Sequence, residues 1–258
     1  MRFAWRGNPE VFRSLGVQSE GEEESGCKAG RLNQASGEFA PFFERARLWE
    51  TARLPSDAAH PIVAGIGGIM SNLIAISGSL RKGSYNTALL RAALEVLPAG
   101  TSMEIASIRD IPLYDGDQEE SVGVPSPVEE LKRRIDSSDG LLIATPEYNH
   151  GVPGVLKNAI DWMTRPPGDV RRVFGGKAVG LMGATPGAGG TRFAQAGWLP
   201  ILHALGMRVW SGRQIYVARA STVFDEKGVM VDDRLRERLA SYLEGFSFFA
   251  GNLQNVRS

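Results

Sequence analysis

The residues best suited to bind an anion lie in one short polar loop at positions 78–87, here called the first loop. Arg81 and Lys82 carry positive charge there, and Gly78 and Gly83 let the backbone approach a ligand closely. Side-chain donors surround them, namely Ser79, Ser84, Asn86 and Thr87. These residue types predict a phosphate site. A capped turn between a strand and a helix is the alternative that this loop alone leaves open, because Ser and Asn are ordinary N-cap residues.

A second polar loop lies further along the chain, at positions 145–154. Its two prolines and two glycines predict a rigid, shaped turn. Within it, Tyr148 can stack on a planar ring and Asn149 can hydrogen-bond to one. A proline in the first turn of a helix would explain Pro153, but not the Glu-Tyr-Asn sequence at 147–149. We expect this second loop to present backbone groups to a planar, polar ring.

A third loop, at positions 183–190, is rich in glycine, and its residues are too small for side-chain catalysis. The elements that position the three loops alternate from Met70 onward. Apolar runs predict strands at 73–76, 102–108, 141–144 and 177–182, with a broken fifth strand at 207–210 and 214–217. Helical spacing predicts helices at 87–97, 128–137, 152–163, 191–205 and 231–246, with an irregular connection at 110–127. This alternation predicts an α/β fold, a doubly wound five-stranded parallel sheet with helices on both faces.

In an open parallel sheet, ligands bind beyond the carboxyl ends of the strands, where the strand order reverses. The three loops follow the first, third and fourth predicted strands. In a sheet of order 2-1-3-4-5 the first and third strands are neighbours, so a crevice opens between the first and second loops. The third loop is positioned to lie against a flat ligand in that crevice.

The first two loops together resemble the NAD(P)H-dependent FMN reductase family of flavodoxin-like proteins. Members of this family include bacterial quinone reductases, often called chromate reductases. The resemblance rests on G-S-L-R-K-G-S at 78–84 with Asn86, P-E-Y-N at 146–149 and P-G-V-L-K-N-A-I-D-W at 153–162, and it extends over about residues 72–217. It implies a flavodoxin-like fold and a bound FMN.

The resemblance also implies which residues bind that FMN. Its phosphate is expected to contact Ser79, Arg81, Ser84 and Asn86. The edge of its isoalloxazine ring is expected to meet Pro146, Glu147, Tyr148 and Asn149, with the loop from Gly183 bordering the ring. The substrate opening is expected to be lined by Tyr148 and His150. Many relatives carry Ser or another small polar residue in place of His150, and a surface histidine without a role is the alternative there.

The activity implied is the reduction of a quinone or a similar acceptor by NADH or NADPH. Hydride would pass from C4 of the nicotinamide to N5 of the flavin, and the acceptor would then take two electrons from the same face in a ping-pong cycle. Chromate, azo dyes, ferric ions and free flavin are further acceptors to consider. No catalytic side chain is expected, because the flavin carries the hydride chemistry.

Two other functional classes stay open. A flavodoxin-type electron carrier also binds FMN, but such carriers are typically acidic and use a Thr-rich phosphate loop. The third class is a flavin-free protein that binds phosphate or a nucleotide. Flavin absorbance and steady-state NAD(P)H consumption distinguish the three classes.

Composition and residue counts argue against several binding partners and catalytic classes. In 258 residues, 29 Lys and Arg balance 29 Asp and Glu, so no net charge attracts nucleic acid or an anionic membrane. Three histidines and one cysteine, Cys27, are too few for a zinc hydrolase, a Cys–His nucleophile or a disulfide framework, and we expect no metal site. The single cysteine and the lack of a long apolar run favour the cytoplasm.

Assembly is expected from the resemblance alone. A homodimer or homotetramer is implied, with four residues as interface candidates: Trp162, Arg165, Arg171 and Trp198. His203 is expected to be a packing or helix-face residue.

Residues 1–69 differ from the rest, because their Gly, Ser, Glu, Arg and Pro residues follow no sustained period apart from a short helical pattern near 42–52. We expect a poorly structured N-terminal extension followed by a flavodoxin-like domain at 70–258. Met70 stands directly before the first predicted strand, so translation from Met70 would explain the difference. A regulatory or oligomerisation arm is the alternative.

Overall fold

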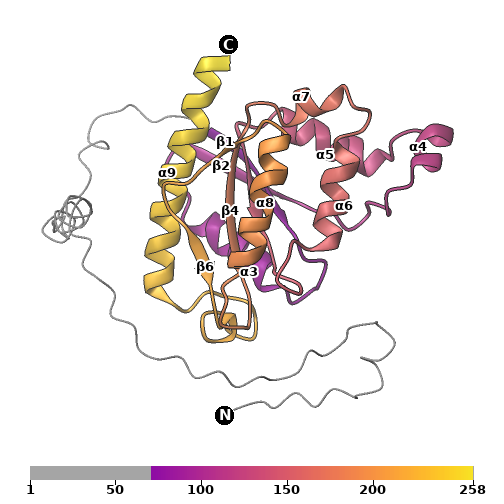
Figure 1. Cartoon of the computed structure of the whole chain (residues 1–258). Coiled ribbons are helices and arrows are strands. Elements are labelled where there is room, and N and C mark those ends of the chain that lie inside the picture. The colour runs from indigo at the N-terminus through magenta and orange to yellow at the C-terminus, as the bar shows by residue number, and fades with distance from the viewer. Residues whose placement is uncertain (1–70, 258) are drawn as a thin grey trace, which may run out of the picture. The chain divides into compact units, whose positions relative to one another are not determined.

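A computed structural model of the protein describes residues 71–257. The expectations for the N-terminal extension, including the helical pattern near 42–52, lie outside these residues. The strands are β1 (Ser71–Ser77), β2 (Thr101–Ala106), β3 (Gly140–Ala144), β4 (Ala178–Ala184), β5 (Arg208–Val209) and β6 (Ile215–Val217). The helices are α3 (Tyr85–Glu95), α4 (Gly116–Val122), α5 (Ser126–Asp136), α6 (Gly154–Met163), α7 (Asp169–Val173), α8 (Arg192–Ala204), η2 (Ala220–Thr222) and α9 (Asp233–Arg257). Figure 1 shows their arrangement.

The strands form one parallel sheet of order β2-β1-β3-β4-β5, which confirms the predicted order 2-1-3-4-5. The predicted break in the fifth strand is also confirmed. β5 pairs with β4 at Ala178 and Val179, near the start of β4, whereas β6 pairs with its end at 182–184. Because these pairings are parallel, β1, β3 and β4 end at the same edge of the sheet, which positions the three loops together.

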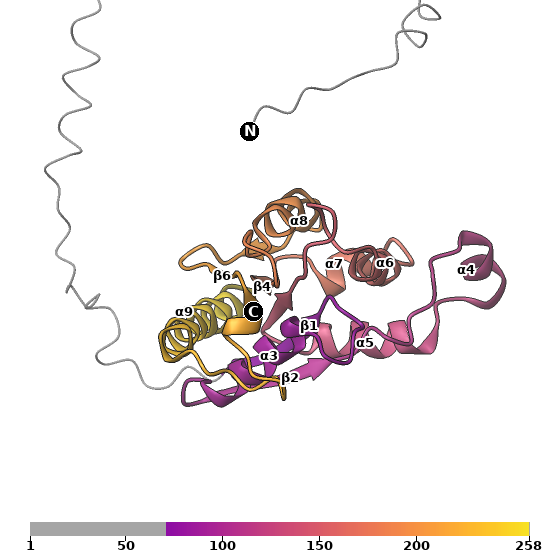
Figure 2. The ribbon, with the colours of Figure 1, turned by 90° about the horizontal axis from the view of Figure 1, so that it is seen from below.

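Alternate residues along the strands pack on opposite faces of the sheet. In β1, Leu73 and Ala75 join a buried cluster with α3 and α9, while Ile74 and Ile76 join a second cluster with α5, α6 and α8. Figure 2 shows α3 and α9 on one side of the sheet and α6 and α8 on the other. Both faces of the strands are buried, which is why the strands appear in the sequence as continuous apolar runs.

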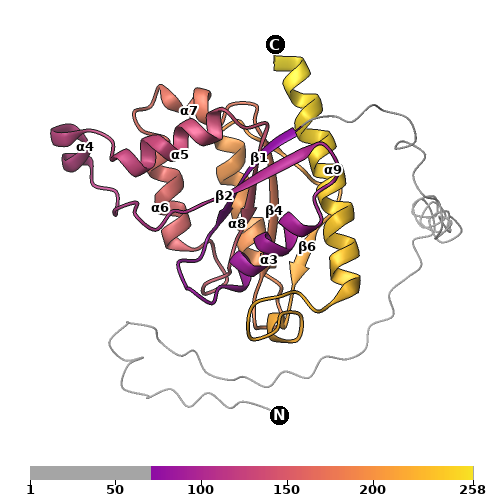
Figure 3. The same cartoon turned by 180° about the vertical axis from the view of Figure 1, so that it is seen from behind.

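The connection at 110–127 was expected to be irregular, and this prediction was wrong. It contains α4, and α5 begins within it at Ser126. No residue of α4 is buried, so this helix has no apolar stripe that periodicity could reveal. Instead, the side chain of Asp115 caps it by accepting a hydrogen bond from the backbone N–H of Asp117 at 3.0 Å. Figures 1 and 3 show α4 projecting from the body of the domain.

Two contacts hold the segment around α4 in place. The Arg165 guanidinium pairs with the Glu119 carboxylate, with Nε 2.8 Å from Oε2. The Asn158 side chain accepts a hydrogen bond from the backbone N–H of Tyr114 and donates one to the carbonyl of Pro112, both at 2.8 Å. Arg165 is thus committed to an ion pair within the chain.

Two of the expected interface residues were placed wrongly. Trp162 and Trp198 are fully buried in the core, so neither can lie at the surface between subunits. Their indole N–H groups donate to the carbonyl of Pro112 at 2.9 Å and to the hydroxyl of Thr145 at 3.1 Å, respectively. His203 is exposed on α8, as expected for a residue on the outer face of a helix.

The C-terminal helix is longer than the pattern predicted. α9 was expected at 231–246, but it continues to Arg257. Beyond Phe246, Ala250 is buried, and Phe249 and Leu253 pack against the same cluster, so the apolar stripe extends past the predicted end. Within residues 71–257, no helix combines the length and the apolar character needed to cross a membrane.

A buried lysine links α5 to α7 on the face opposite α9. The side chain of Lys132 is fully buried, and its Nζ lies 2.6 Å from Oδ2 of Asp169 and 2.5 Å from Oε1 of Glu129. It also donates to the carbonyl of Arg165 at 2.8 Å. Hydrogen bonds from Arg172 and Lys132 hold the pKa of Asp169 below its ordinary value. A carboxyl group with a lowered pKa stabilises the fold above that ordinary value, and the effect is lost as pH falls through the folded-state pKa.

Replacing Asp169 by Asn should therefore lower the free energy of unfolding at pH 7 by roughly 2–3 kcal/mol, because Lys132 loses one of its two carboxylate partners. The difference should close as pH falls below about 4. Asp161→Asn is the matched control, since Lys157–Asp161 is an exposed pair of the same residue types and should contribute less than about 0.5 kcal/mol. Urea unfolding at several pH values measures both. Equal losses in the two variants would contradict a special role for the buried pair.

Candidate functional site

Short backbone hydrogen bonds join the three loops at the carboxyl edge of the sheet. The N–H of Gly78 donates to the carbonyl of Ala144 at 2.9 Å, and the N–H of Thr145 donates to the carbonyl of Met182 at 2.8 Å. The sheet pairing therefore continues for one residue beyond β1 and β3 before the loops diverge. The loops begin from one rigid edge.

The first loop ends in a helix N-terminus that is open to an anion. Ser84 is the N-cap of α3, and its hydroxyl accepts a hydrogen bond from the backbone N–H of Thr87 at 3.3 Å. The N–H groups of Tyr85 and Asn86, in the first turn, have no acceptor within the helix. Positive charge from the helix dipole adds to that of the exposed Arg81 nearby. This donor set fits a phosphate monoester.

The side chain of Asn86 is engaged within the chain. Its side chain is buried, Nδ2 donates to the carbonyl of Ala184 at 2.9 Å, and Oδ1 accepts from the N–H of Ala184 at 2.9 Å. The amide is therefore engaged with the end of β4, and Asn86 offers a ligand only its backbone N–H. It ties the start of α3 to the start of the third loop.

The second loop is a tight hairpin, as its prolines and glycines predicted. The backbones of Tyr148 and Gly151 pair with each other through N–H to carbonyl hydrogen bonds of 3.3 and 3.0 Å. Between them, Asn149 and His150 have φ of 50° and 59°, which is the left-handed pair that a two-residue type I′ turn requires. The turn holds Tyr148 half exposed beside the first loop.

Direct contacts join the first and second loops. The Tyr148 hydroxyl lies 3.5 Å from the hydroxyl of Ser79. Deeper down, a Cβ added to Gly78 would lie 2.8 Å from Cδ of Pro146 and 2.9 Å from a methyl group of Leu156. Gly78 thus allows a close approach that any side chain would prevent. The helix N-terminus of α3 and the Tyr148 hairpin form one continuous surface.

The carboxylate of Glu147 binds the start of α8. Its Oε2 accepts hydrogen bonds from the backbone N–H groups of Phe193 and Ala194 at 2.9 and 3.1 Å, so the carboxylate caps the N-terminus of α8. Its Oε1 lies 3.5 Å from Nδ1 of His150. The His150 ring is exposed and meets the ring of Phe193 edge-on, with centroids 5.2 Å apart. Glu147 therefore orients the hairpin and α8, and it can offer a ligand only its backbone.

The third loop begins later than predicted, because β4 continues through Ala184. Gly183 is a buried strand residue, and a Cβ there would lie 2.1 Å from the hydroxyl of Thr191 and 2.3 Å from the carbonyl of Thr145. This glycine serves close packing between β4 and the start of α8. The residues that can border a ligand in the third loop are those from Thr185 onward, and 186–189 are exposed.

The carboxyl edge also holds polar residues that the sequence patterns did not single out. Arg91 lies one helical turn after Thr87 on α3, and Ser107 and Arg109 directly follow β2. The guanidinium of Arg109 donates to the carbonyl of Leu80 in the first loop. The position of Ser107 and Arg109 directly after a parallel strand is the signal that would have identified them. Within residues 71–257, no group of His, Cys, Asp and Glu side chains is arranged to hold a metal ion.

The chain is similar to known flavoenzymes over nearly all of the described region. Residues 71–222 match the family described as NADPH-dependent FMN reductase. The sequence is 40% identical to an NAD(P)H-dependent FMN reductase of Pseudomonas aeruginosa, over 70% of this chain and 96% of that protein. It is 34% identical to a 2-hydroxy-1,4-benzoquinone reductase of a Burkholderia species, over 67% of this chain and 92% of that protein.

Solved structures agree with this assignment. The fold is similar to that of FerB, a flavoenzyme NAD(P)H:(acceptor) oxidoreductase from Paracoccus denitrificans, with a TM-score of 0.64 and 31% sequence identity. That match covers 71% of this chain and 98% of FerB. The expected flavodoxin-like architecture and enzyme class are thereby confirmed. On its sequence, its fold and the donor set of its first loop, the chain belongs to the NADPH-dependent FMN reductase family.

Proposed function

We propose that this enzyme reduces a quinone with electrons from NADH or NADPH, using an FMN bound across the first and second loops. The observation that carries the proposal is the continuous surface between the N-terminus of α3 and the Tyr148 hairpin. One part of this surface suits a phosphate, and the other suits a planar ring with polar edges. FMN combines these two groups in one molecule.

At the phosphate end, Ser79 and Arg81 would bind the anion with their side chains, and Ser84 would hold the helix start in position. The side chain of Ser79 accepts a hydrogen bond from the N–H of Arg81 at 3.4 Å, which keeps the turn compact. Asn86 would contribute its backbone N–H, because its side chain is engaged with Ala184. Charge-assisted hydrogen bonds of this kind are among the stronger ones in proteins.

At the ring end, the backbone of 146–149 would meet the polar edge of the isoalloxazine, with Tyr148 at its rim. Donors aimed at that edge are the means by which a protein tunes a flavin. The third loop would border the ring through residues after Ala184, and Gly183 would support it from within the strand. Tyr148 and His150 would line the opening for the acceptor.

When bound, FMN supplies the redox chemistry, accepting a hydride from NAD(P)H and giving two electrons to the acceptor in a ping-pong cycle. The chain itself would bind and orient the reactants. It needs no side chain as acid or base for the hydride step. A quinone is the acceptor class proposed, supported by the similarity to a benzoquinone reductase. Chromate, azo dyes, ferric ions and free flavin are further acceptors within the same proposal.

Assembly into a homodimer or homotetramer belongs to the same proposal, and so does localisation in the cytoplasm. Exposed apolar side chains beside the proposed ring site support assembly, namely Tyr148, Val155, Phe193 and Leu199. Arg165, which is partly exposed beside Glu119, and Arg171, which is exposed on α7, remain interface candidates.

Activity is the first test. Purified protein reconstituted with FMN should show flavin absorbance and oxidise NADH or NADPH with a benzoquinone, at a turnover number of roughly 1–1,000 per second. Stopped-flow reduction by NAD(P)H without acceptor, followed by reoxidation with quinone, measures the two half-reactions separately. A yellow protein that consumes no NAD(P)H would favour an electron carrier. A colourless protein that does not take up FMN would contradict the proposal.

Replacing Arg81 by Ala should weaken FMN binding about tenfold or more, because one charge-assisted contact with the phosphate is lost. Fluorescence titration of the apoprotein with FMN measures the dissociation constant. Titration with riboflavin, which lacks the phosphate, should give the same value for the variant and the parent. Arg171→Ala is the control, because α7 precedes β4 and lies at the opposite edge of the sheet. FMN binding as tight as in the parent would rule out the role assigned to Arg81.

A further inference from the structure

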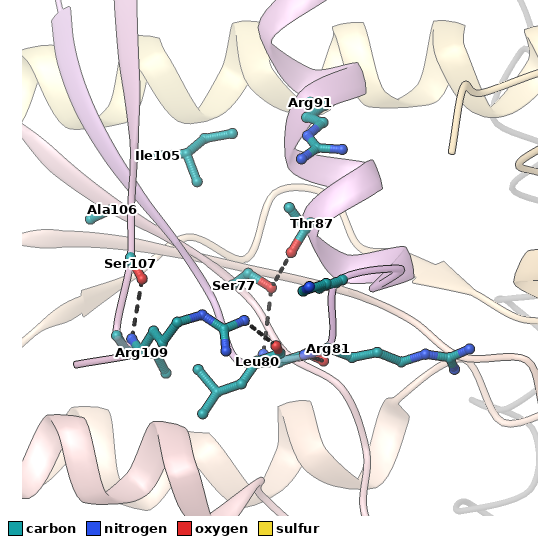
Figure 4. A pocket seen from close by; sticks show the side chains of 12 residues that line it. Ser77, Leu80, Arg81, Thr87, Arg91, Ile105, Ala106, Ser107 and Arg109 are labelled. Atoms are coloured by element: carbon teal, nitrogen blue, oxygen red, sulfur yellow. Dashed lines mark hydrogen bonds between the residues drawn. The ribbon is translucent and has the colours of Figure 1, made fainter. Parts of the chain in front are cut away.

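A pocket of about 380 Å³ lies beside the first loop, on the side away from the second loop. It opens between the first loop, α3 and the end of β2, and Figure 4 shows the side chains that line it. Residues 84–86 and 145–149 are not among them. The lining residues are Ser77, Ser79, Leu80, Arg81, Lys82, Thr87, Arg91, Ile105, Ala106, Ser107, Ile108 and Arg109. The pocket therefore lies beside the surface assigned to FMN, and it shares with that surface the side chains of Ser79 and Arg81.

The lining of this pocket is strongly cationic. It contains Arg81, Lys82, Arg91 and Arg109, and it contains no acidic residue. No ion pair joins any of these four cations to a carboxylate within the part of the chain that the structure describes. In Figure 4, Arg91 reaches from α3 toward Ile105 of β2, and Arg109 reaches toward Leu80. Arg81 is assigned to the FMN phosphate, and the remaining like charges of Lys82, Arg91 and Arg109 repel one another, so that a second bound anion would relieve their repulsion.

The pocket also has hydroxyl groups and an apolar wall. Ser77, Thr87 and Ser107 supply the hydroxyl groups, and the wall is formed by Leu80, Ile105 and Ile108. Its volume lies within the range of about 300–1,000 Å³ that is typical of sites for small organic ligands. The lining thus suits a ligand that joins phosphate to an apolar ring, such as a phosphorylated nucleoside.

We propose that this pocket binds the adenosine end of NADPH, with the 2′-phosphate among its arginines. This inference rests on the function proposed above, in which NAD(P)H reaches a ring held at the end of β3. Adjacent strands lie about 4.8 Å apart, so the ends of β2 and β3, on either side of β1, are separated by about 10 Å. An extended dinucleotide spans that distance across the first loop. The extra dianionic phosphate of NADPH gives Lys82, Arg91 and Arg109 more charge to bind than NADH does.

Arg91 is the residue that tests the proposal most cleanly. It is exposed and lines the pocket, and no hydrogen bond or ion pair of its side chain is seen among residues 71–257. Arg109, in contrast, holds the first loop through Leu80, so its replacement would also disturb the FMN surface. Arg234→Gln is the matched control, because Arg234 is an exposed arginine on α9 and its replacement removes the same charge.

The experiment uses the FMN-loaded full-length enzyme and two measurements. Arg91→Gln should lower the ratio of kcat/KM for NADPH to that for NADH about tenfold, the loss expected for one charge-assisted contact. Isothermal titration with adenosine 2′,5′-bisphosphate should show binding that competes with NADPH and weakens by a similar factor in Arg91→Gln. The flavin content of the variant should match that of the parent, and Arg234→Gln should match the parent throughout.

Three results would overturn the proposal. Loss of FMN from Arg91→Gln would assign the pocket to the flavin site. Binding of the bisphosphate that depends on Arg91 but does not compete with NADPH would indicate a separate phosphate-bearing ligand. Binding and coenzyme preference that do not change in Arg91→Gln would exclude a role for the pocket with ligands of this class. The titration needs no turnover, so it remains informative about the pocket even if the enzyme oxidises neither coenzyme.

Discussion

The two hydrogen bonds between the side-chain amide of Asn86 and the backbone of Ala184 fix the geometry on which the site depends. The amide is buried, so each bond forms in a low-dielectric environment, and breaking one would leave a buried polar group without a partner. Through this contact the N-terminus of α3 is held against the end of β4. The start of α3, to which the proposed function assigns the phosphate, and the third loop are therefore linked by this side chain.

A side chain of the second loop has a similar structural role. The carboxylate of Glu147 binds the N-terminus of α8, so the hairpin that carries Tyr148 is attached to a long helix rather than to solvent. Asn86 and Glu147 were expected to contact a ligand, and in the structure their side chains connect secondary-structure elements. What they leave exposed to a ligand is backbone, together with Ser79, Arg81 and Tyr148. One side of the first loop faces the second loop, and the other side faces the cationic pocket at β2.

Much of this arrangement could be predicted from the sequence, because the relevant signals are local. Apolar runs mark buried parallel strands, and the loops that follow them lie at one edge of the sheet. The strand order 2-1-3-4-5, and with it the pairing of the first two loops, came from the flavodoxin-like fold that the resemblance implies. The prediction of FMN as the cofactor came from the family resemblance. The roles of Asn86 and Glu147 could not be predicted in this way, since an amide or a carboxylate in a loop suits a ligand and a backbone partner equally well. Only the distance to Ala184 or to Phe193 distinguishes the two.

Other features were missed because they depend on non-local contacts. α4 has no buried residue, so its helical period leaves no trace in the pattern. Trp162 and Trp198 were named as interface candidates with the assembly that the resemblance implied, whereas acceptors on distant segments satisfy their N–H groups inside the core. Arg91 and Arg109 lie on separate elements, and the parallel pairing of β1 with β2 brings them to one pocket. Charged residues outside a recognisable motif can be assigned to a common site only once the strand pairing is known.

The contact of Gly78 with Pro146 and Leu156 has a consequence for how such an enzyme can change during evolution. A Cβ at position 78 would overlap Pro146 and Leu156, so a substitution there would have to move the two loops apart. The rim is under no such restriction, because His150 and Phe193 are exposed and contact mainly each other. On the proposed function, substitutions at the rim would change the choice of electron acceptor while leaving the junction at Gly78 in place.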